Sequence, residues 1–405
     1  MRSLLITYVW PEPNASAAGA RDMSLIEIFL KAGWEVTCLS PSKENAFSEK
    51  IRAQGVATVS MGPNDSRFDE FISQLKPDFV LFDRFVTEEQ FGWRVHEHSP
   101  ETIRVLDTQD LHFLRRARQR VLDGGALDLV NDDSLREIAS IYRSDLTLIL
   151  SDFEINLLMN QFRVPEHLLA LSRFCYPDPT PQPFFKEREN FVMIGNFRHP
   201  PNADGVLWLK REIWPHIHDR LPRAQAHIYG AYPSREMMAL TDAKIGFHVK
   251  GSAPDAIETL RSYRINLAPL RFGAGIKGKI TDGWSAGTPV VSTPVGAEGM
   301  HGGLPWGGAI ESEPRAFAER AISLYTDETL WSEARENGFR ILKGLFHLDA
   351  NSKKLIDDLL EARKNASKRR TENFIGAMLQ HHFHKSTTYF SKWIELKEER
   401  ATPAS

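Results

Sequence analysis

Short apolar runs of strand length alternate with longer amphipathic stretches along the first 150 residues. Six such runs are Leu4 to Val9, Glu35 to Leu39, Val56 to Met61, Phe79 to Phe82, Ile103 to Leu106 and Leu146 to Leu150. Helical patterns lie between them, and this alternation is typical of parallel strands joined by right-handed crossovers. The pattern predicts an α/β domain with an open, doubly wound sheet.

A proline-rich stretch, Tyr176 to Arg188, separates this region from a second one of the same kind. Four prolines stand at alternate positions, at Pro177, Pro179, Pro181 and Pro183. They exclude a continuing helix and favour an extended connector. The second set of strand-length runs is Phe191 to Ile194, Ala226 to Tyr229, Gly246 to Val249, Ile265 to Leu270 and Pro289 to Ser292.

We therefore divide the chain into a first domain (1–176), a linker (177–188), a second domain (189–350) and a helical tail (351–405). The two domains should be Rossmann-like sandwiches that face a cleft. In the tail, apolar residues at helical spacing predict one or two amphipathic helices: Phe374, Met378, Tyr389, Trp393 and Ile394. The preceding basic run, Arg363 to Arg370, is interpreted as a solvated helix face, with contact to anionic lipid as the alternative.

Composition narrows the class further. A chain of 405 residues is long enough for two domains that each bury a core. A net charge of −3 gives no reason to expect nucleic acid as a partner. The two cysteines, Cys38 and Cys175, form no metal or disulfide pattern, which fits a reducing compartment. No apolar stretch has transmembrane length, and the first run is too short for a signal sequence, so we expect a cytoplasmic protein.

The stretch from Ala268 to Met300 joins a strand, a glycine-rich loop, a helix and a second strand in one short unit. Gly273, Gly275 and Gly278 let the backbone turn sharply and approach a ligand closely. The helix that follows, Ile276 to Ala286, directs unpaired amide N–H groups and the positive end of its dipole back toward the loop. Such an arrangement is typical of phosphate sites.

Cationic side chains surround this loop. Lys277 and Lys279 add charge, and the planar fork of Arg271 suits a diphosphate. Three cations beside a turn that served only the backbone would repel each other, so we favour an anion site over a merely tight turn. Asp282 shares a helix face with Lys279 and could meet sugar hydroxyls while the lysine meets phosphate. The unit therefore predicts nucleotide-sugar recognition.

The same unit resembles the donor-binding segment of the family 4, or group 1, glycosyltransferases, in the branch that reads P-L-R-x-G-A-G-I-K-G-K and then G-x-P-V-V. Other segments are also similar to that family: Trp10 to Arg21, Val105 to Arg116, and Ile194 to Trp208. The resemblance spans most of the chain. It implies two facing Rossmann-like domains (the GT-B fold), a C-terminal tail that returns to the first domain, and sugar transfer with retention and without a metal ion.

By this resemblance Arg271 and Lys279 are catalytic cations that hold the diphosphate, and Asp282 hydrogen-bonds the ribose. Gly273, Gly275 and Lys277 belong to the same donor site. One position departs from the family, which commonly carries two glutamates eight positions apart. The first of them falls at Ala274 and the second is replaced by Asp282, which leaves the usual contact to the donor sugar open.

Two further segments are candidates for the donor side. Glu298 follows a strand at the carboxyl edge of the predicted sheet, where it could contact donor hydroxyls or begin a helix. Arg198 ends the first strand of the second domain and could approach the phosphates, with a surface ion pair as the alternative. His199, next to it, is interpreted as structural.

Candidates for the acceptor side follow strands of the first domain. Asp107, Asp110 and His112 lie after a strand, at the edge of the cleft, and either face the acceptor or cap the helix that follows. Asp110 and His112 are the catalytic candidates, although many relatives carry a histidine where Gln109 stands. Gly19 and Arg21 end a proline-rich loop that could admit substrate. The loop lacks the G-x-G-x-x-G pattern of a dinucleotide site.

His381, His382 and His384 lack the additional ligand that a metal site requires, so we predict no metal and no cofactor. The favoured function is a glycosyltransferase that uses a nucleotide-diphosphate sugar as donor and a glycan, lipid or small molecule as acceptor. A nucleotide-sugar-binding protein without activity and a sugar-nucleotide epimerase of the same architecture are the alternatives. Peripheral contact with the inner face of a membrane stays open.

Overall fold

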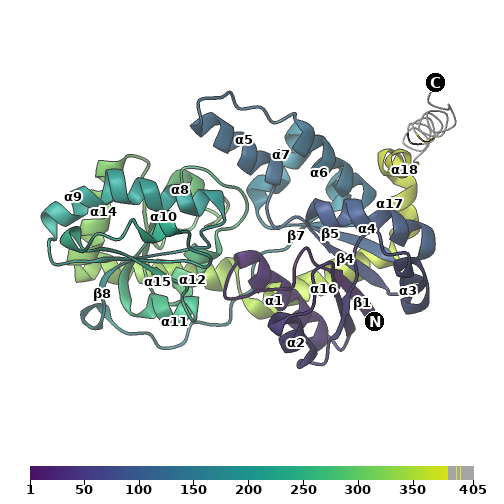
Figure 1. Cartoon of the computed structure of the whole chain (residues 1–405), viewed down its shortest axis with the longest axis horizontal. Coiled ribbons are helices and arrows are strands. Elements are labelled where there is room, and N and C mark those ends of the chain that lie inside the picture. Colours follow the sequence, from purple (N-terminus) through teal and green to yellow (C-terminus); the bar gives the residue numbers. More distant parts are fainter. Residues whose placement is uncertain (382–388, 390–392, 394–405) are drawn as a thin grey trace, which may run out of the picture.

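The computed structural model describes residues 1–381 together with Tyr389 and Trp393. Two parallel sheets with flanking helices form two sandwiches side by side (Figure 1). The strand order is β3-β2-β1-β4-β5-β6-β7 in the first sheet and β10-β9-β8-β11-β12-β13 in the second. Every pairing within the two sheets is parallel. The doubly wound α/β architecture predicted from the alternating pattern is confirmed.

The strands of the first sheet are β1 (Arg2–Ile6), β2 (Glu35–Ser40), β3 (Ala57–Ser60), β4 (Phe79–Asp83), β5 (Ile103–Asp107), β6 (Leu146–Ile149) and β7 (Leu169–Leu171). Those of the second are β8 (Glu189–Ile194), β9 (Ala226–Tyr229), β10 (Phe247–Gly251), β11 (Tyr263–Ala268), β12 (Val290–Ser292) and β13 (Gly308–Ile310). The sequence pattern missed β7 and β13. Each is a three-residue edge strand, too short to show a period.

The helices of the first domain are α1 (Ala17–Lys31), α2 (Ala46–Arg52), α3 (Arg67–Leu75), α4 (Arg84–His98), α5 (His112–Leu122), α6 (Asp132–Arg143) and α7 (Asp152–Gln161). Those of the second are α8 (Pro200–Trp208), α9 (Trp214–Arg220), α10 (Arg235–Met238), α11 (Ala256–Arg261), α12 (Gly278–Ser285), α13 (Pro294–Ala297), α14 (Pro314–Thr326) and α15 (Glu328–Leu345). A π-helical segment, Leu209–Ile213, joins α8 to α9. Pro215 lacks the amide that an unbroken α-helix needs at this point.

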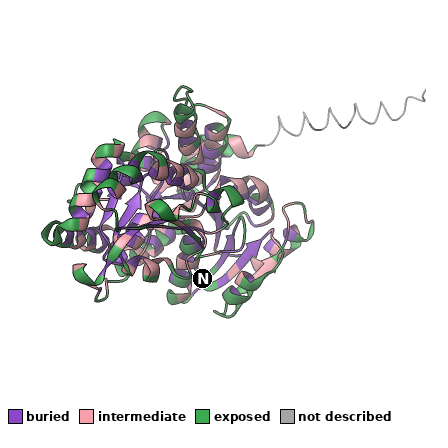
Figure 2. Ribbon diagram, turned by 60° about the vertical axis from the view of Figure 1, so that its left-hand side comes forward, coloured by how far each residue is buried: buried purple, intermediate pink, exposed green. Residues whose placement is uncertain are grey.

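Both faces of each sheet are covered, so the central strands are apolar on both sides. Along β1, Leu4 and Ile6 pack into one core cluster and Leu5 into another. Figure 2 shows the buried strands as purple bands inside a shell of partly exposed helices. A two-sided core explains why these strands read as continuous apolar runs rather than as an alternation.

The tail returns to the first domain. Helix α16 (Leu348–Lys364) leaves the second domain, and its Leu355, Leu359 and Ala362 belong to a core cluster of the first domain (Figure 1). Two short helices follow, α17 (Ala366–Glu372) and α18 (Phe374–Gln380). No helix in the part of the chain described here has both the length and the apolarity that a membrane crossing requires. The predicted tail position Ile394 lies outside the described residues.

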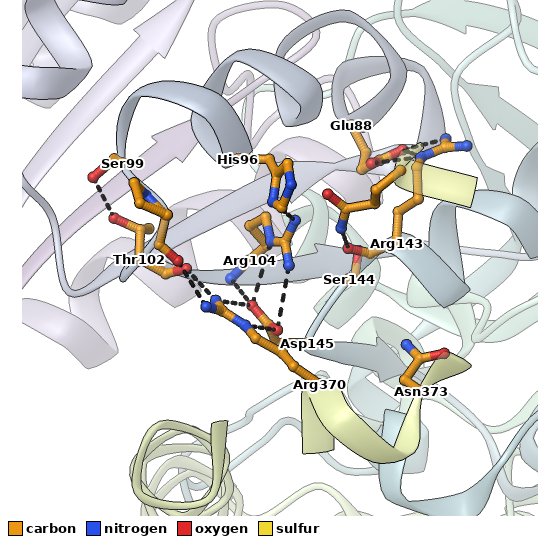
Figure 3. A network of polar contacts seen from close by, with 12 residues as sticks. Glu88, His96, Ser99, Thr102, Arg104, Arg143, Ser144, Asp145, Arg370 and Asn373 are labelled. Carbon is orange, nitrogen blue, oxygen red and sulfur yellow. Dashed lines mark hydrogen bonds and ion pairs between the residues drawn. The ribbon is translucent and has the colours of Figure 1, made fainter. Parts of the chain in front are cut away.

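A buried carboxylate anchors the tail. Asp145 receives Arg370 Nε on one oxygen at 2.7 Å and Nη2 on the other at 2.8 Å, and Arg104 approaches it at 3.4 Å (Figure 3). Burial alone would raise the pKa of Asp145, but the hydrogen bonds from Arg370 and the charge of Arg104 outweigh it and hold the pKa below its usual range. Asn373 adds a hydrogen bond to the carbonyl oxygen of Tyr142 at 2.7 Å.

Replacing Asp145 by asparagine should lower the free energy of unfolding by about 3 kcal/mol, because Arg104 loses its counter-charge while it stays buried. The difference in the free energy of unfolding between the variant and the wild type should narrow only in acid, below the carboxyl's usual pKa near 3.8. The reason is that a carboxyl with a lowered pKa in the folded state contributes stability at pH values above its usual pKa and loses that contribution as the pH falls. Urea denaturation measures both effects. Arg136→Gln, which removes an exposed pair with Glu89, should cost less than about 1 kcal/mol. Equal losses in the two variants would contradict the anchoring role.

Candidate active site at the interface of the two domains

The glycine-rich loop leaves the carboxyl end of β11 and enters α12. Gly275 has a φ of +66°, a left-handed conformation that glycine adopts without strain. The helix begins at Gly278, two residues later than predicted, and Lys277 at its N-cap position makes no side-chain cap. The loop and helix therefore have the predicted order, with a longer loop than the sequence pattern indicated.

Lys279 reaches the first strand and first helix of the second domain. Its Nζ contacts Asn202 Oδ1 on α8. It also lies at the end of β8, because a Cβ built on Gly195 would be 2.9 Å from Lys279 Nζ. The N-terminal end of α8 lies at the same place but offers no free amide there, because Pro200 and Pro201 have no N–H and the amides of Asn202 and Ala203 donate to the carbonyl oxygen of His199 at 2.9 and 3.3 Å. The amine of Lys279 and the positive end of the α8 dipole lie together, and both favour an anion.

Burial, together with the charge of Lys277, lowers the pKa of Lys279 to about 7, against the opposing charge of Asp282. Burial raises the pKa of Asp282 to about 6. Asp282 accepts a hydrogen bond from the hydroxyl of Tyr176 at 2.6 Å. No local sequence pattern indicates Asn202 or Tyr176, because Asn202 contacts a residue 77 positions away and Tyr176 contacts one 106 positions away.

Arg271 lies on a different face of α8. It forms an ion pair with Asp204, two residues after Asn202, and its guanidinium lies 5.9 Å from the centre of the Trp208 ring. Arg198 is exposed and stacks on Tyr232 at 4.0 Å. Neither arginine shares the Lys279–Asn202 contact, so both would have to turn to meet the same phosphates.

Polar groups in and near the glycine loop form hydrogen bonds with the first domain or within the loop itself. Arg118 on α5 donates to both oxygens of Glu298 at 2.8 Å and to the carbonyl oxygen of Gly273 at 2.8 Å. Lys277 is buried and donates to the carbonyl oxygen of Gly275 at 2.7 Å. Desolvation lowers the pKa of Lys277 to about 8, against the opposing charge of Glu298.

The helix-start interpretation of Glu298 is wrong, because the residue follows the C-terminus of α13. Its carboxylate is bound by Arg118, and contact with donor hydroxyls stays a prediction. Arg118 was missed because it lies 180 positions away, in a run of arginines that reads as an ordinary basic helix.

Asp110 and His112 lie together at the domain interface. His112 Nε2 is 3.2 Å from one oxygen of Asp110, and Arg115 Nε is 2.6 Å from the other. Burial would raise the pKa of Asp110, but the charges of Arg115 and His112 and their hydrogen bonds hold it well below the usual range. A Cβ on Gly275 would be 2.8 Å from Asp110 Cβ, so this pair touches the glycine loop directly.

His199 belongs to the same group of residues. Solvent reaches its ring, yet protein from both domains surrounds it closely enough for desolvation to lower its pKa to about 4. The charged groups that act on it are Asp110, Arg115, Lys279 and His112. Its interpretation as a structural residue stays a prediction.

The expectation that Arg21 and Asp107 face the acceptor is wrong in this structure. Their side chains are 3% and 0% exposed and form an ion pair at 2.7 Å, with Ser172 on the far nitrogen of Arg21 at 3.1 Å. Burial raises the pKa of Asp107. Gly19 lies inside α1, and a Cβ there would be 2.6 Å from the backbone of Glu12, so close packing accounts for that glycine.

The helix-cap alternatives are also wrong. The first amides of α5 are bound by two buried glutamates that sequence analysis missed: Glu154 accepts from Leu111 at 3.1 Å, and Glu137 accepts from His112 at 3.2 Å and Phe113 at 3.1 Å.

Gln109 adopts a left-handed backbone with a φ of +61°. Its side-chain nitrogen donates to Asp22 at 2.9 Å and to Asp83 at 3.2 Å. Burial, followed by the charge of Asp83, raises the pKa of Asp22 well above its usual value.

Among the described residues no cluster of three or more His, Cys, Asp or Glu could hold a metal ion. His382 and His384, which the sequence pattern did not favour as metal ligands, lie outside the described residues.

Comparison with known proteins agrees with this geometry. Residues 188–327, the stretch that holds the glycine loop and Lys279, match the family model "Glycosyl transferases group 1". No curated protein matches the sequence.

Solved structures match nearly the whole chain. A mutant of TarM from S. aureus, in complex with fondaparinux, alpha-GlcNAc-glycerol and UDP, is 10% identical, with a TM-score of 0.71 over 89% of this chain and 100% of that one. Sucrose-phosphate synthase from Thermosynechococcus elongatus is 14% identical, with a TM-score of 0.68 over 91% and 100%. HepE from Anabaena in complex with UDP-glucose is 11% identical, with a TM-score of 0.66 over 89% and 99%. The fold is therefore of the GT-B type.

In the free protein the amine of Lys279 should titrate near pH 7, far below the value of about 10.4 for exposed lysines, because burial disfavours its charged form. Reductive methylation with ¹³C-formaldehyde followed by NMR titration measures each amine. Lys279→Met assigns the signal by removing it. A Lys279 pKa above about 9 would contradict a desolvated amine.

Proposed function

We propose that the protein is a glycosyltransferase that moves a sugar from a nucleotide-diphosphate sugar to an acceptor hydroxyl. The observation that carries this proposal is the position of Lys279, whose amine contacts Asn202 in the first turn of α8, within the segment that matches the group 1 glycosyltransferase model. A buried amine beside the positive end of a helix dipole suits a phosphate group. Complexes of TarM with UDP and of HepE with UDP-glucose support a uridine nucleotide as the first donor to test.

The chemical task is to stabilise charge on the departing diphosphate as the glycosidic bond breaks. Lys279 and the positive end of the α8 dipole would meet that charge, and a diphosphate would in turn restore the protonated form of the lysine. Asp282, which accepts a hydrogen bond from Tyr176, would bind ribose hydroxyls. Arg271 would join the phosphates by leaving Asp204. We propose retention of the anomeric configuration and independence of a metal ion on the basis of the family resemblance alone.

On the acceptor side the low pKa of Asp110 makes its carboxylate a weak base. Its contact with His112 instead orients the imidazole. The lowered pKa of His199, about 4, makes its imidazole a weak base as well, so we assign neither residue as the acceptor of the hydroxyl proton.

Lys279→Ala should lower kcat by about a hundredfold, because it removes one charge contact that is strongest in the transition state. Transfer of labelled sugar from UDP-glucose and other nucleotide sugars measures the rate. Lys343→Ala, at an exposed position on α15, is the matched control and should leave the rate unchanged. Unchanged turnover in Lys279→Ala would remove the lysine from the mechanism.

The alternatives give different results in the same assays. A binding protein without activity would give heat with UDP, GDP, ADP or TDP in calorimetry but no transfer, and an epimerase would convert its donor without an acceptor. The absence of heat and stabilisation with all four nucleotides at millimolar concentration would overturn the proposal as a whole.

We also propose that the protein acts in the cytoplasm, in peripheral contact with a membrane through its tail. On α18, Phe374, Ile375 and Met378 are 75%, 44% and 55% exposed, beside the basic run of α16 and α17. Co-sedimentation with phosphatidylglycerol vesicles should exceed that with phosphatidylcholine vesicles. Phe374→Asp should weaken it severalfold, whereas Leu330→Asp, at an exposed leucine of the second domain, should not. No sedimentation with anionic vesicles at low salt would contradict the contact.

A further inference from the structure

Glu154 is a buried carboxylate that binds backbone from both domains. It is 1% exposed, and one oxygen, Oε1, accepts hydrogen bonds from Leu111 N at 3.1 Å in the first domain and from Gly275 N at 2.9 Å in the second. The other oxygen accepts from the hydroxyl of Ser151 at 3.2 Å. Leu111 directly precedes His112, and Gly275 is the centre of the glycine loop. The carboxylate thus joins the acceptor-side segment to the donor-side loop.

The sequence around Glu154 suggests a more ordinary role. Ser151 to Glu154 reads as a capping box, in which the glutamate side chain turns back to the N-cap amide of its own helix. In the structure Ser151 caps α7 by accepting from Glu154 N at 3.2 Å, but the carboxylate points to Leu111 and Gly275 instead. A local cap does not need a bond to a residue 121 positions away.

The packing around α7 supports the same interpretation. Two glycines of the second domain face the first domain at distances that exclude a side chain: a Cβ on Gly275 would be 2.8 Å from Asp110 Cβ, and a Cβ on Gly299 would be 2.6 Å from Ser151 Cβ. Gly275 therefore lies against the segment before α5, and Gly299 lies against the start of α7. Gly303, which has a similar left-handed φ of +81°, has no atom within 4 Å of a built Cβ.

Charged groups of both domains act on the Glu154 carboxylate. Lys277, buried beside the loop, acts on Glu154 from the second domain, and Asp110 acts on it from the first. Desolvation raises the pKa of Glu154 to about 7, against the hydrogen bonds from Leu111 and Gly275. Arg118, bound to Glu298 and to the carbonyl oxygen of Gly273, is a second and separate link between the same loop and the first domain.

We propose that Glu154 is a positioning residue that sets the glycine loop of the second domain in register with the Asp110–His112 segment of the first. It touches no substrate and acts through the backbone of Gly275 and Leu111. The geometric part of this proposal does not depend on the chemistry of transfer; its effect on turnover rests on the proposed function.

The test compares Glu154→Gln with Glu137→Gln in the full chain. Glu137 is the matched control, since it is also 1% exposed and accepts two amides of the same α5 terminus, both of which belong to the first domain. Small-angle X-ray scattering at pH 8 without ligand should give a larger radius of gyration for Glu154→Gln than for the wild type or Glu137→Gln. As the pH falls from 8 to 6 the wild type should approach the Glu154→Gln profile, because protonation removes the same charge. Equal profiles for all three proteins at pH 8 would overturn the proposal.

Two further measurements separate positioning from a loss of folding. Gly275→Ala should expand the protein as Glu154→Gln does, whereas Gly303→Ala, with the same backbone strain and no neighbour, should not. In transfer assays Glu154→Gln should lower kcat by about tenfold with UDP affinity nearly unchanged, since it misaligns two intact half-sites. If no nucleotide binds any variant, the proposed function fails while the scattering result still decides the role of Glu154. Equal expansion in Gly275→Ala and Gly303→Ala would contradict it.

Discussion

Charged groups that are buried where two domains meet need bonded partners from one domain or the other, and this constraint shapes the interface. Arg118 binds Glu298 across the interface, and Glu154 takes an amide of the glycine loop. Removing water from such groups is costly unless hydrogen bonds replace it. These hydrogen bonds and ion pairs form only when the two domains lie close together, and the glycines of the second domain allow that close approach.

The fold was predictable from the sequence because its strands are long enough to show their apolar character. Only β7 and β13, three residues each, escaped. The predicted anion site rests on local features, namely three glycines, a helix start and the cations around them. What the sequence could not provide was the partner of each charged group. Tyr176 reaches Asp282 and Arg118 reaches Glu298 across more than a hundred positions, and no local pattern encodes such pairings.

The same limit explains the wrong assignments. Arg21 and Asp107 have the chemistry and the strand-end position of acceptor residues, but they neutralise each other below the surface. Around the glycine loop, by contrast, burial shifts Lys279 and Asp282 toward their neutral forms, with pKa values of about 7 and 6. An anion bound beside Lys279 would favour the charged form of its amine.

The chain passes between the domains twice, and the two passages are bonded to each other. Tyr176, at the end of the first domain, donates its amide to Phe346 at 2.7 Å and accepts the amide of Leu348 at 2.8 Å, where α16 begins its return. Two crossings joined at one point leave the domains a single pivot, and opening should take place as rotation about it. The side chain of that same tyrosine holds Asp282. The predicted sugar-binding residue Asp282 is thus linked, through Tyr176, to the point about which the two domains would rotate.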